Sequence, residues 1–167
     1  MTAMQWKLNS SVGPIYIVAS ESGLQGLYWK RQAIQMAVHL NEDSPTTKIL
    51  VAASKEIENY FSGRSKTFKV PLNLVGTAFQ KKVWRALQQI PFGETRSYKD
   101  IANAIKHPKA FRAVGSANRV NPVCVIVPCH RVISSDGTLG GYVGGLKRKS
   151  KLLMLEKNLI RERSNLF

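Results

Sequence analysis

The stretch that most constrains this chain is residues 121–133, NPVCVIVPCHRVI. Residues 123–127 are rich in β-branched side chains, which favour a buried extended segment. Pro128 ends that segment immediately before Cys129, because proline cannot continue a regular backbone ladder. We therefore predict that Cys129 is held in one place, at the end of a stiff and buried segment.

Cys129 has two neighbours that suit a nucleophile. His130 can take up a thiol proton near neutral pH, and Arg131 is a permanent cation that favours the thiolate. A cysteine hydrolase would use the same pair of residues, but adjacent residues seldom place thiol and imidazole side by side, and no oxyanion-hole motif is recognisable. A thiol redox protein would favour Cys-x-x-Cys, whereas the second cysteine, Cys124, lies five residues away.

The two cysteines are expected to be free thiols. A disulfide between positions 124 and 129 would need a sharp local fold, which an extended segment does not provide. Two thiols without a cluster of histidines also make a poor zinc site. We expect no metal and no cofactor.

The net charge of +15 points to a polyanionic partner. The basic residues recur along the chain, which favours a folded basic face over a disordered arm, although solubility alone could also explain the excess. A chain of 167 residues that is 44% hydrophobic can bury a core in one or two domains. No apolar run approaches the length of a membrane span and no signal peptide is recognisable, so we expect a cytoplasmic protein without membrane association.

The first half has the pattern of a small α/β scaffold. Residues 4–9, 14–19 and 24–29 are predicted to form an antiparallel meander, and residues 47–61 a helix. Residues 31–46 could carry a helical stripe that ends at 41–45, and residues 69–74 could add an edge strand. No catalytic set is recognisable in this half.

The second half is predicted to be mainly helical, with helices at residues 78–90, 98–105 and 109–119. Thr77 and Ser97 are candidate N-caps, and the last two helices suggest a helix-turn-helix. The third helix offers small residues, among them Ala110, Ala113 and Gly115, which suit close approach to a minor groove. Simple helix packing is the alternative explanation for these small residues.

The PCHR tetrapeptide, preceded by NP and followed by VISSDG and GGYVGGL, resembles the signature of the O6-alkylguanine-DNA alkyltransferases. The resemblance runs from about residue 77 to residue 157. It implies an RNase H-like α/β domain at residues 1–75, with a small antiparallel sheet and helices. It also implies a mainly α domain at residues 76–167 with a winged-helix-like helix-turn-helix. The expected partner is double-stranded DNA that contains O6-alkylguanine, bound by a monomer.

The resemblance also assigns the catalytic residues. Cys129 would accept the alkyl group irreversibly, while His130, oriented by Glu156, relays its proton through water. Asn121 would connect the helix-turn-helix to the cysteine segment, and Tyr98 would support base flipping and then hydrogen-bond the base. Without the resemblance, Glu156 would be interpreted as a solvated helix residue.

The family pattern further implies how DNA and the base are held. Arg112 would enter the duplex and fill the place of the extruded nucleotide, and Lys99 and Ser135 would contact the DNA backbone. Tyr142 would line the base pocket, the backbone N–H of Val143 would reach guanine O6, and the carbonyls of Cys129 and Val132 would accept from the exocyclic amine.

Cys124 stands where some relatives have proline, and we expect its thiol to be structural. O4-alkylthymine is a second expected substrate. The main alternative function is a non-catalytic binder of alkylated DNA, against which the cysteine at 129 argues.

Overall fold

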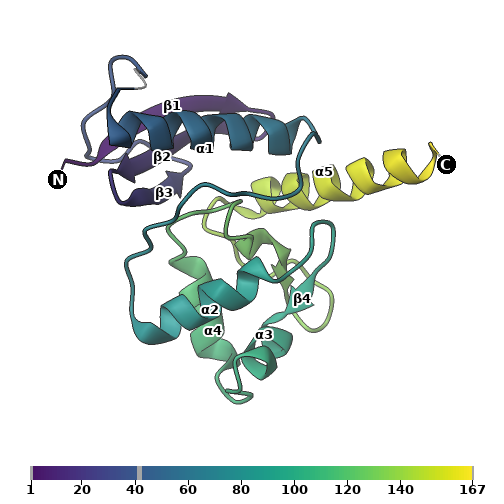
Figure 1. The fold of residues 1–167 in the computed structure, drawn as a ribbon. Coiled ribbons are helices and arrows are strands. Elements are labelled where there is room, and N and C mark those ends of the chain that lie inside the picture. The colour runs from purple at the N-terminus through teal and green to yellow at the C-terminus, as the bar shows by residue number, and fades with distance from the viewer. Residues whose placement is uncertain (1, 41–42, 167) are drawn as a thin grey trace. The chain divides into compact units, whose positions relative to one another are not determined.

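The computed structural model describes residues 2–40 and 43–166, and it divides into two compact units, Met1–Val75 and Gly76–Phe167. Figure 1 shows the helices and strands of both units, and each unit buries its own set of apolar side chains. Among the residues that the structure describes, no helix is both long and apolar enough to cross a membrane.

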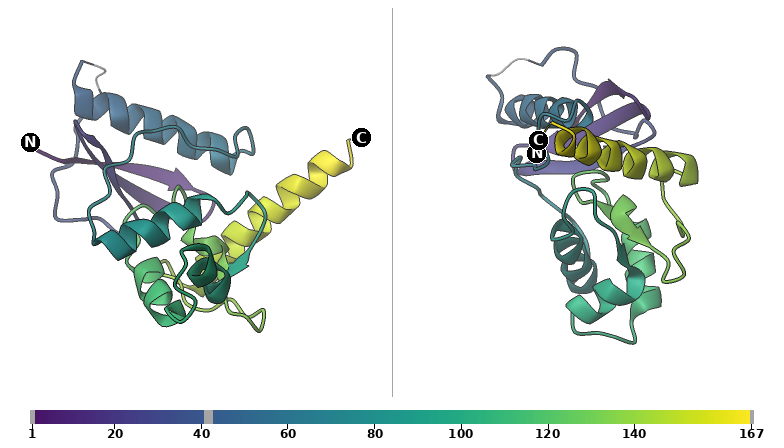
Figure 2. Two further views of the ribbon diagram at one scale, coloured as in Figure 1. Left: turned by 60° about the horizontal axis from the view of Figure 1, so that its bottom comes forward. Right: turned by 90° about the vertical axis from the view of Figure 1, so that its right-hand side faces the viewer.

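The first unit is a three-stranded antiparallel sheet covered by one helix. The strands β1 (Met4–Ser10), β2 (Gly13–Ser20) and β3 (Gly23–Tyr28) lie in sequence order, and α1 (Pro45–Phe61) packs against one face of the sheet (Figure 2). The predicted meander is therefore confirmed. Its core consists of apolar side chains that alternate along the strands or recur along α1: Ile15, Ile17, Leu27, Leu50 and Ile57.

Three expectations for this unit need correction. Residues 31–40 form no helix, because their backbone pairs with β1 instead: Gln5 N donates to Gln35 O, and Ala37 N donates to Gln5 O. Residues 41 and 42 of the predicted stripe lie outside the described residues. Pro45 does not end a helix but begins α1, since proline suits the first helical position. The predicted edge strand is reduced to a single bridge between Leu72 and Leu24.

The second unit is built from α2 (Ala78–Gln88), α3 (Tyr98–Ala104), α4 (Phe111–Arg119) and α5 (Leu146–Ser164). Thr77 and Ser97 cap α2 and α3, as predicted, and each forms a reciprocal capping box. The helices α3 and α4 pack on α2 as a helix-turn-helix. Trp84 lies at the centre of this core, and its indole Nε1 donates to Ala117 O at 2.9 Å. The third predicted helix begins at Phe111 rather than 109, because residues 107–110 form a turn.

The segment before the cysteine is buried but is not extended, which corrects the prediction for residues 123–127. It folds into a tight turn in which Ile126 N donates to Cys124 O and Val127 N donates to Val123 O, both at 2.9 Å. Val125 has a φ of 72°, an unusual conformation for a β-branched residue. The turn leads into the 3-10 helix η1 (Cys129–Arg131) and strand β5 (Val132–Ile133), which pairs in parallel with β4 (Arg96–Ser97).

Candidate active site

Asn121 holds the turn that positions Cys129. Its side-chain Nδ2 donates to Val127 O at 2.8 Å, and its Oδ1 accepts from Val123 N at 3.0 Å. Cys129 N in turn donates to Val127 O at 2.8 Å. The side chain of Cys129 is buried at the first position of η1, so its thiol has a fixed place. The structure thus brings Asn121 and Cys129 together.

The surroundings of Cys129 favour the thiolate. A hydrogen bond with the Cys124 thiol lowers the pKa of Cys129 most, and burial acts in the opposite direction. A hydrogen bond with the Asn121 side chain and the positive charge of Lys149 lower that pKa further. The net effect is a thiol that ionises more readily than an ordinary cysteine, whose pKa is about 8.5.

His130 and Glu156 form a fully buried pair. The His130 Nε2 lies 2.7 Å from Glu156 Oε1, and neither side chain is exposed to solvent. Arg131 binds the same carboxylate through Nε and Nη2, at 3.0 and 2.8 Å, and Gly93 N donates to Glu156 Oε2. Burial raises the pKa of Glu156, but its hydrogen bonds and ion pairs with His130 and Arg131 outweigh burial and lower that pKa to about 2. Glu156 is therefore ionised at neutral pH.

An ionised Glu156 determines which nitrogen of His130 can act as a base. The carboxylate can only accept, so His130 Nε2 carries the hydrogen and Nδ1 carries the lone pair. Among the described residues, this buried Nδ1 has no hydrogen-bond partner. Burial lowers the pKa of His130, although the hydrogen bond and charge of Glu156 act against that shift. A neutral imidazole with a free Nδ1 next to Cys129 is suited to accept a proton.

Lys149 is a functional candidate that the sequence analysis did not find. Its side chain is fully buried, and Nζ donates to the carbonyls of Val132, Leu139 and Gly141. Burial lowers the pKa of Lys149 to about 8, while the charge of Cys129 acts in the opposite direction. Lys149 is thus mostly protonated at neutral pH, fixes the backbone of residues 139–141, and supplies positive charge near Cys129.

The predicted pocket residues lie in or near the glycine-rich loop of residues 137–145. Tyr98 is half-buried, and its pKa is raised by burial and by Cys129 and lowered by a hydrogen bond to the backbone of Gly141. Val132 is fully buried, Tyr142 is half-buried, and Val143 is about half exposed. The structure therefore brings Tyr98 together with Cys129 and the glycine-rich loop.

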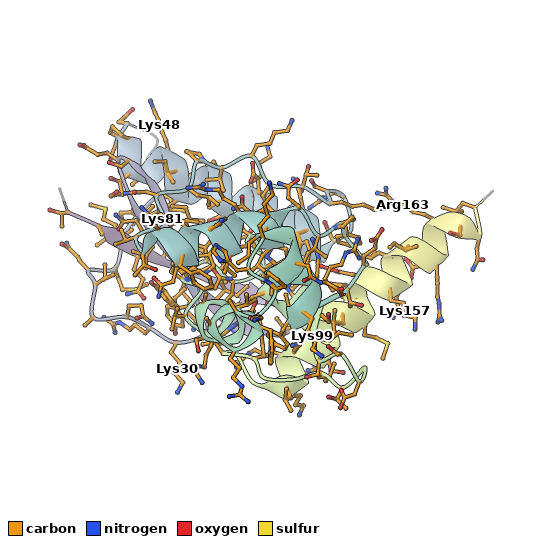
Figure 3. The ribbon with its side chains drawn as sticks, turned by 90° about the horizontal axis from the view of Figure 1, so that it is seen from below. Lys30, Lys48, Lys81, Lys99, Lys157 and Arg163 are labelled. Carbon is orange, nitrogen blue, oxygen red and sulfur yellow. The ribbon has the colours of Figure 1, made fainter. Side chains whose placement is uncertain are left out.

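The predicted DNA-contacting residues lie on the helix-turn-helix, except for Ser135, and most of them are exposed. Arg112 and Ala113 on α4 are exposed, while Ala110 and Gly115 are partly covered. An added Cβ on Gly115 would lie 3.8 Å from the Tyr98 ring, which is ordinary contact. Lys99 is exposed, with Nζ 5.8 Å from the centre of the Phe111 ring, and Figure 3 shows it projecting from the ribbon. Ser135 is exposed in the loop after β5. Residues 2–40 and 43–166 contain no group of three or more His, Cys, Asp or Glu side chains placed to hold a metal ion.

The fold and the site define a helix-turn-helix protein with an activated thiol nucleophile. The family model for the 6-O-methylguanine DNA methyltransferase DNA binding domain matches residues 78–158, and the model for the ribonuclease-like domain of the same family matches residues 5–74. The chain belongs to the O6-alkylguanine-DNA alkyltransferase family, which confirms the resemblance and the predicted fold class.

Individual relatives match almost the whole chain. A methylated-DNA–protein-cysteine methyltransferase of Methanosarcina barkeri is 46% identical over 156 residues, which cover 92% of this chain and 97% of that protein. A protein of the same name from Mycobacterium leprae is 42% identical, with 96% of each chain covered. The crystal structure of Mycobacterium tuberculosis OGT in complex with DNA matches with a TM-score of 0.81 and 41% identity, covering 93% of this chain and 94% of that one.

Proposed function

We propose that this protein repairs DNA by direct reversal, as a methylated-DNA–protein-cysteine methyltransferase that moves the alkyl group of O6-alkylguanine to Cys129. The observation that carries the proposal is the buried Cys129 beside a neutral His130 whose Nε2 is tied to an ionised Glu156. The names of the relatives that match nearly the full length support the same activity.

The reaction is one displacement at the alkyl carbon. His130 Nδ1 takes the thiol proton through a water molecule, and Cys129 Sγ then attacks the carbon bound to O6. A sulfur–carbon bond forms, the carbon–oxygen bond breaks with its electron pair left on guanine, and guanine takes up the proton that the thiol lost. A thioether carries no leaving group that water or a side chain can readily displace, so each protein molecule acts once, and the reaction needs no cofactor.

Backbone groups are suited to recognise the base. Val143 N–H would donate to O6, and the carbonyls of Cys129 and Val132 would accept from the exocyclic amine, with Tyr98 and Tyr142 beside them. Val132 O already accepts from Lys149, but a carbonyl oxygen has two lone pairs and can accept a second hydrogen bond. O4-alkylthymine also carries its alkyl group on a base-pairing oxygen, so we include it as a second substrate.

The number of lesions that each protein molecule repairs distinguishes this proposal from other activities. Protein mixed with a tenfold excess of a duplex that contains one O6-methylguanine is expected to repair one lesion per protein molecule and then stop. Cys129→Ser is expected to repair none while still binding the lesion duplex. Tight binding without repair by the unmodified protein would instead support a non-catalytic binder of alkylated DNA. Repair of many lesions per molecule would rule out a self-alkylating mechanism.

Base flipping is the second part of the proposal. O6 lies on the pairing edge of guanine, so the thiolate can reach the alkyl carbon only when the nucleotide leaves the base stack, at a cost of a few kcal/mol. Arg112 is exposed at the start of α4, where it can fill the space that the nucleotide leaves. Tyr98 lies between α4 and the loop, where it can support the extruded nucleotide.

Arg112→Ala is expected to slow repair of the duplex lesion about 10- to 100-fold. The reason is that Arg112 would stabilise the flipped state by about one to three kcal/mol, and the variant loses this stabilisation. The rate with free O6-methylguanine base should not change, since that substrate needs no flipping. Arg119→Ala, a change of another exposed arginine on the same helix, is the matched control for lost charge. Equal slowing by both variants, or slowing with the free base, would contradict the role of Arg112 in flipping.

A further inference from the structure

The tight turn at residues 123–127 brings the two cysteine side chains together. An extended segment would separate positions 124 and 129 by about 16 Å, whereas the positive φ of Val125 turns the chain back on itself. The two backbone hydrogen bonds across the turn and the bond from Cys129 N to Val127 O hold this shape. The thiols of Cys124 and Cys129 are hydrogen-bonding partners.

Asn121 contacts both thiols. Its backbone carbonyl accepts from Cys124 Sγ at 3.9 Å, and its side chain hydrogen-bonds Cys129. Both cysteines are free and almost completely buried, with 2% and 1% of their surfaces exposed. Cys124 is therefore a fixed neighbour of the nucleophile, and not only a filler of the core, which revises the expectation drawn from the sequence.

We propose that Cys124 and Cys129 form a reversible dithiol–disulfide site that reacts with hydroperoxides. The Cys129 thiolate attacks a peroxide oxygen, the O–O bond breaks, and Cys129 becomes a sulfenic acid as the peroxide is reduced to water or an alcohol. Cys124 Sγ then attacks the sulfenic sulfur, the S–O bond breaks, and a second water leaves with the Cys124 proton. Two thiols and one hydrogen peroxide thus give one disulfide and two waters.

The neighbouring thiol decides the fate of an oxidised Cys129. A sulfenic acid without a nearby thiol reacts with a second peroxide molecule and becomes a sulfinic acid, which thiol reductants do not reverse. With Cys124 in contact, closing the disulfide requires no movement of another segment, and a dithiol reductant restores both thiols. Because each molecule has one alkyl acceptor, this site would preserve the acceptor during oxidative stress. The preserved alkyl transfer rests on the proposed function, whereas formation of the disulfide does not.

The test is intact mass after a brief treatment of the reduced full-length protein with hydrogen peroxide, followed by iodoacetamide under denaturing conditions. We expect a species about 2 Da lighter than the reduced protein that takes up no iodoacetamide, and full recovery of both alkylatable thiols after dithiothreitol. Cys124→Ser should instead gain about 32 Da as sulfinic acid and should not recover with dithiothreitol. Cys129→Ser should keep its remaining thiol at the same dose of peroxide.

Three results would overturn the proposal. The first is formation of sulfinic acid in the unmodified protein at the rate seen in Cys124→Ser. The second is formation of disulfide-linked dimers in place of the internal disulfide. The third is oxidation of Cys124 in Cys129→Ser at the same dose of peroxide. None of these readouts uses DNA, so a failure here can be distinguished from a failure of the repair reaction. Cys124→Ala removes both the thiol and its hydrogen bond, whereas Cys124→Ser keeps a hydrogen-bonding group. Both variants should respond to peroxide in the same way. If Cys129 of the alanine variant were still protected reversibly, a disulfide with Cys124 would be excluded.

Discussion

Glu156→Ala is expected to destabilise the second unit by about 3–5 kcal/mol, because it removes the only carboxylate that pairs with the buried Arg131 among the described residues. The carboxylate accepts from Arg131, Gly93 and His130, and none of these donors would find a replacement in the core. Unfolding in urea, followed through Trp84 in variants that lack the other two tryptophans, measures the effect. Glu162→Ala removes an exposed glutamate of the same helix and should not change the midpoint. Equal effects of the two substitutions would contradict the buried ion pair.

Acid should reproduce this loss in the unmodified protein. The pKa of Glu156 is about 2 in the folded protein, below its ordinary value of 4.5, so the folded state binds its proton less readily than the unfolded chain does. The stabilisation is therefore complete above about pH 4.5 and is lost as the pH falls from there towards 2, and it amounts to the order of 3 kcal/mol. Glu156→Gln cannot ionise at this position, so its stability should depend less steeply on pH across that interval. Identical slopes would show that other groups cause the acid sensitivity.

His130→Asn is expected to slow alkyl transfer about 100- to 10,000-fold, the range for loss of a positioned general base. The reason is geometric: Glu156 holds the proton on Nε2, and the free Nδ1 is the only ring atom able to accept the thiol proton. Single-turnover rates with an O6-methylguanine duplex measure the effect, and His39→Asn, a change of an exposed histidine in the first unit, is the control.

The pH profile of the variant distinguishes the two possible roles of His130. If His130 acts as the base, the rate of His130→Asn should rise more steeply with pH than the rate of the unmodified protein, because hydroxide replaces the missing acceptor. A variant that is slow at every pH by the same factor, with a lowered unfolding midpoint, would show that His130 only supports the structure around Cys129.

Elements with short-range signals were predictable from the sequence. Thr77 and Ser97 were recognisable as caps because Gln80 and Asp100 stand three residues later and complete capping boxes. The three strands followed from alternating apolar residues between turns. The β-branched run before Cys129 was misleading. The side chain of Asn121 hydrogen-bonds both ends of this run and holds it in a turn, and these hydrogen bonds outweigh the local preference for an extended backbone.

The buried polar side of α5 was the least predictable part of the site. Lys149, Leu152 and Glu156 are its buried residues, and their spacing of three and four places them on one face. That periodicity was present in the sequence, but the surrounding basic residues indicated a solvated helix, and a buried lysine is rare without partners. Its partners are backbone carbonyls of residues 132, 139 and 141, which carry no signal in the side-chain pattern.

The central claim is that Cys129, and not its contacting neighbour Cys124, receives the alkyl group. Both cysteines lie in one tryptic peptide, residues 120–131, because trypsin cleaves after Arg119 and after Arg131. After reaction with a duplex that contains O6-methylguanine, fragmentation of this peptide should place a single methyl group of about 14 Da on Cys129, and leave Cys124 open to iodoacetamide. A methyl group on Cys124, or an unmodified peptide after the lesion has disappeared from the DNA, would contradict the account.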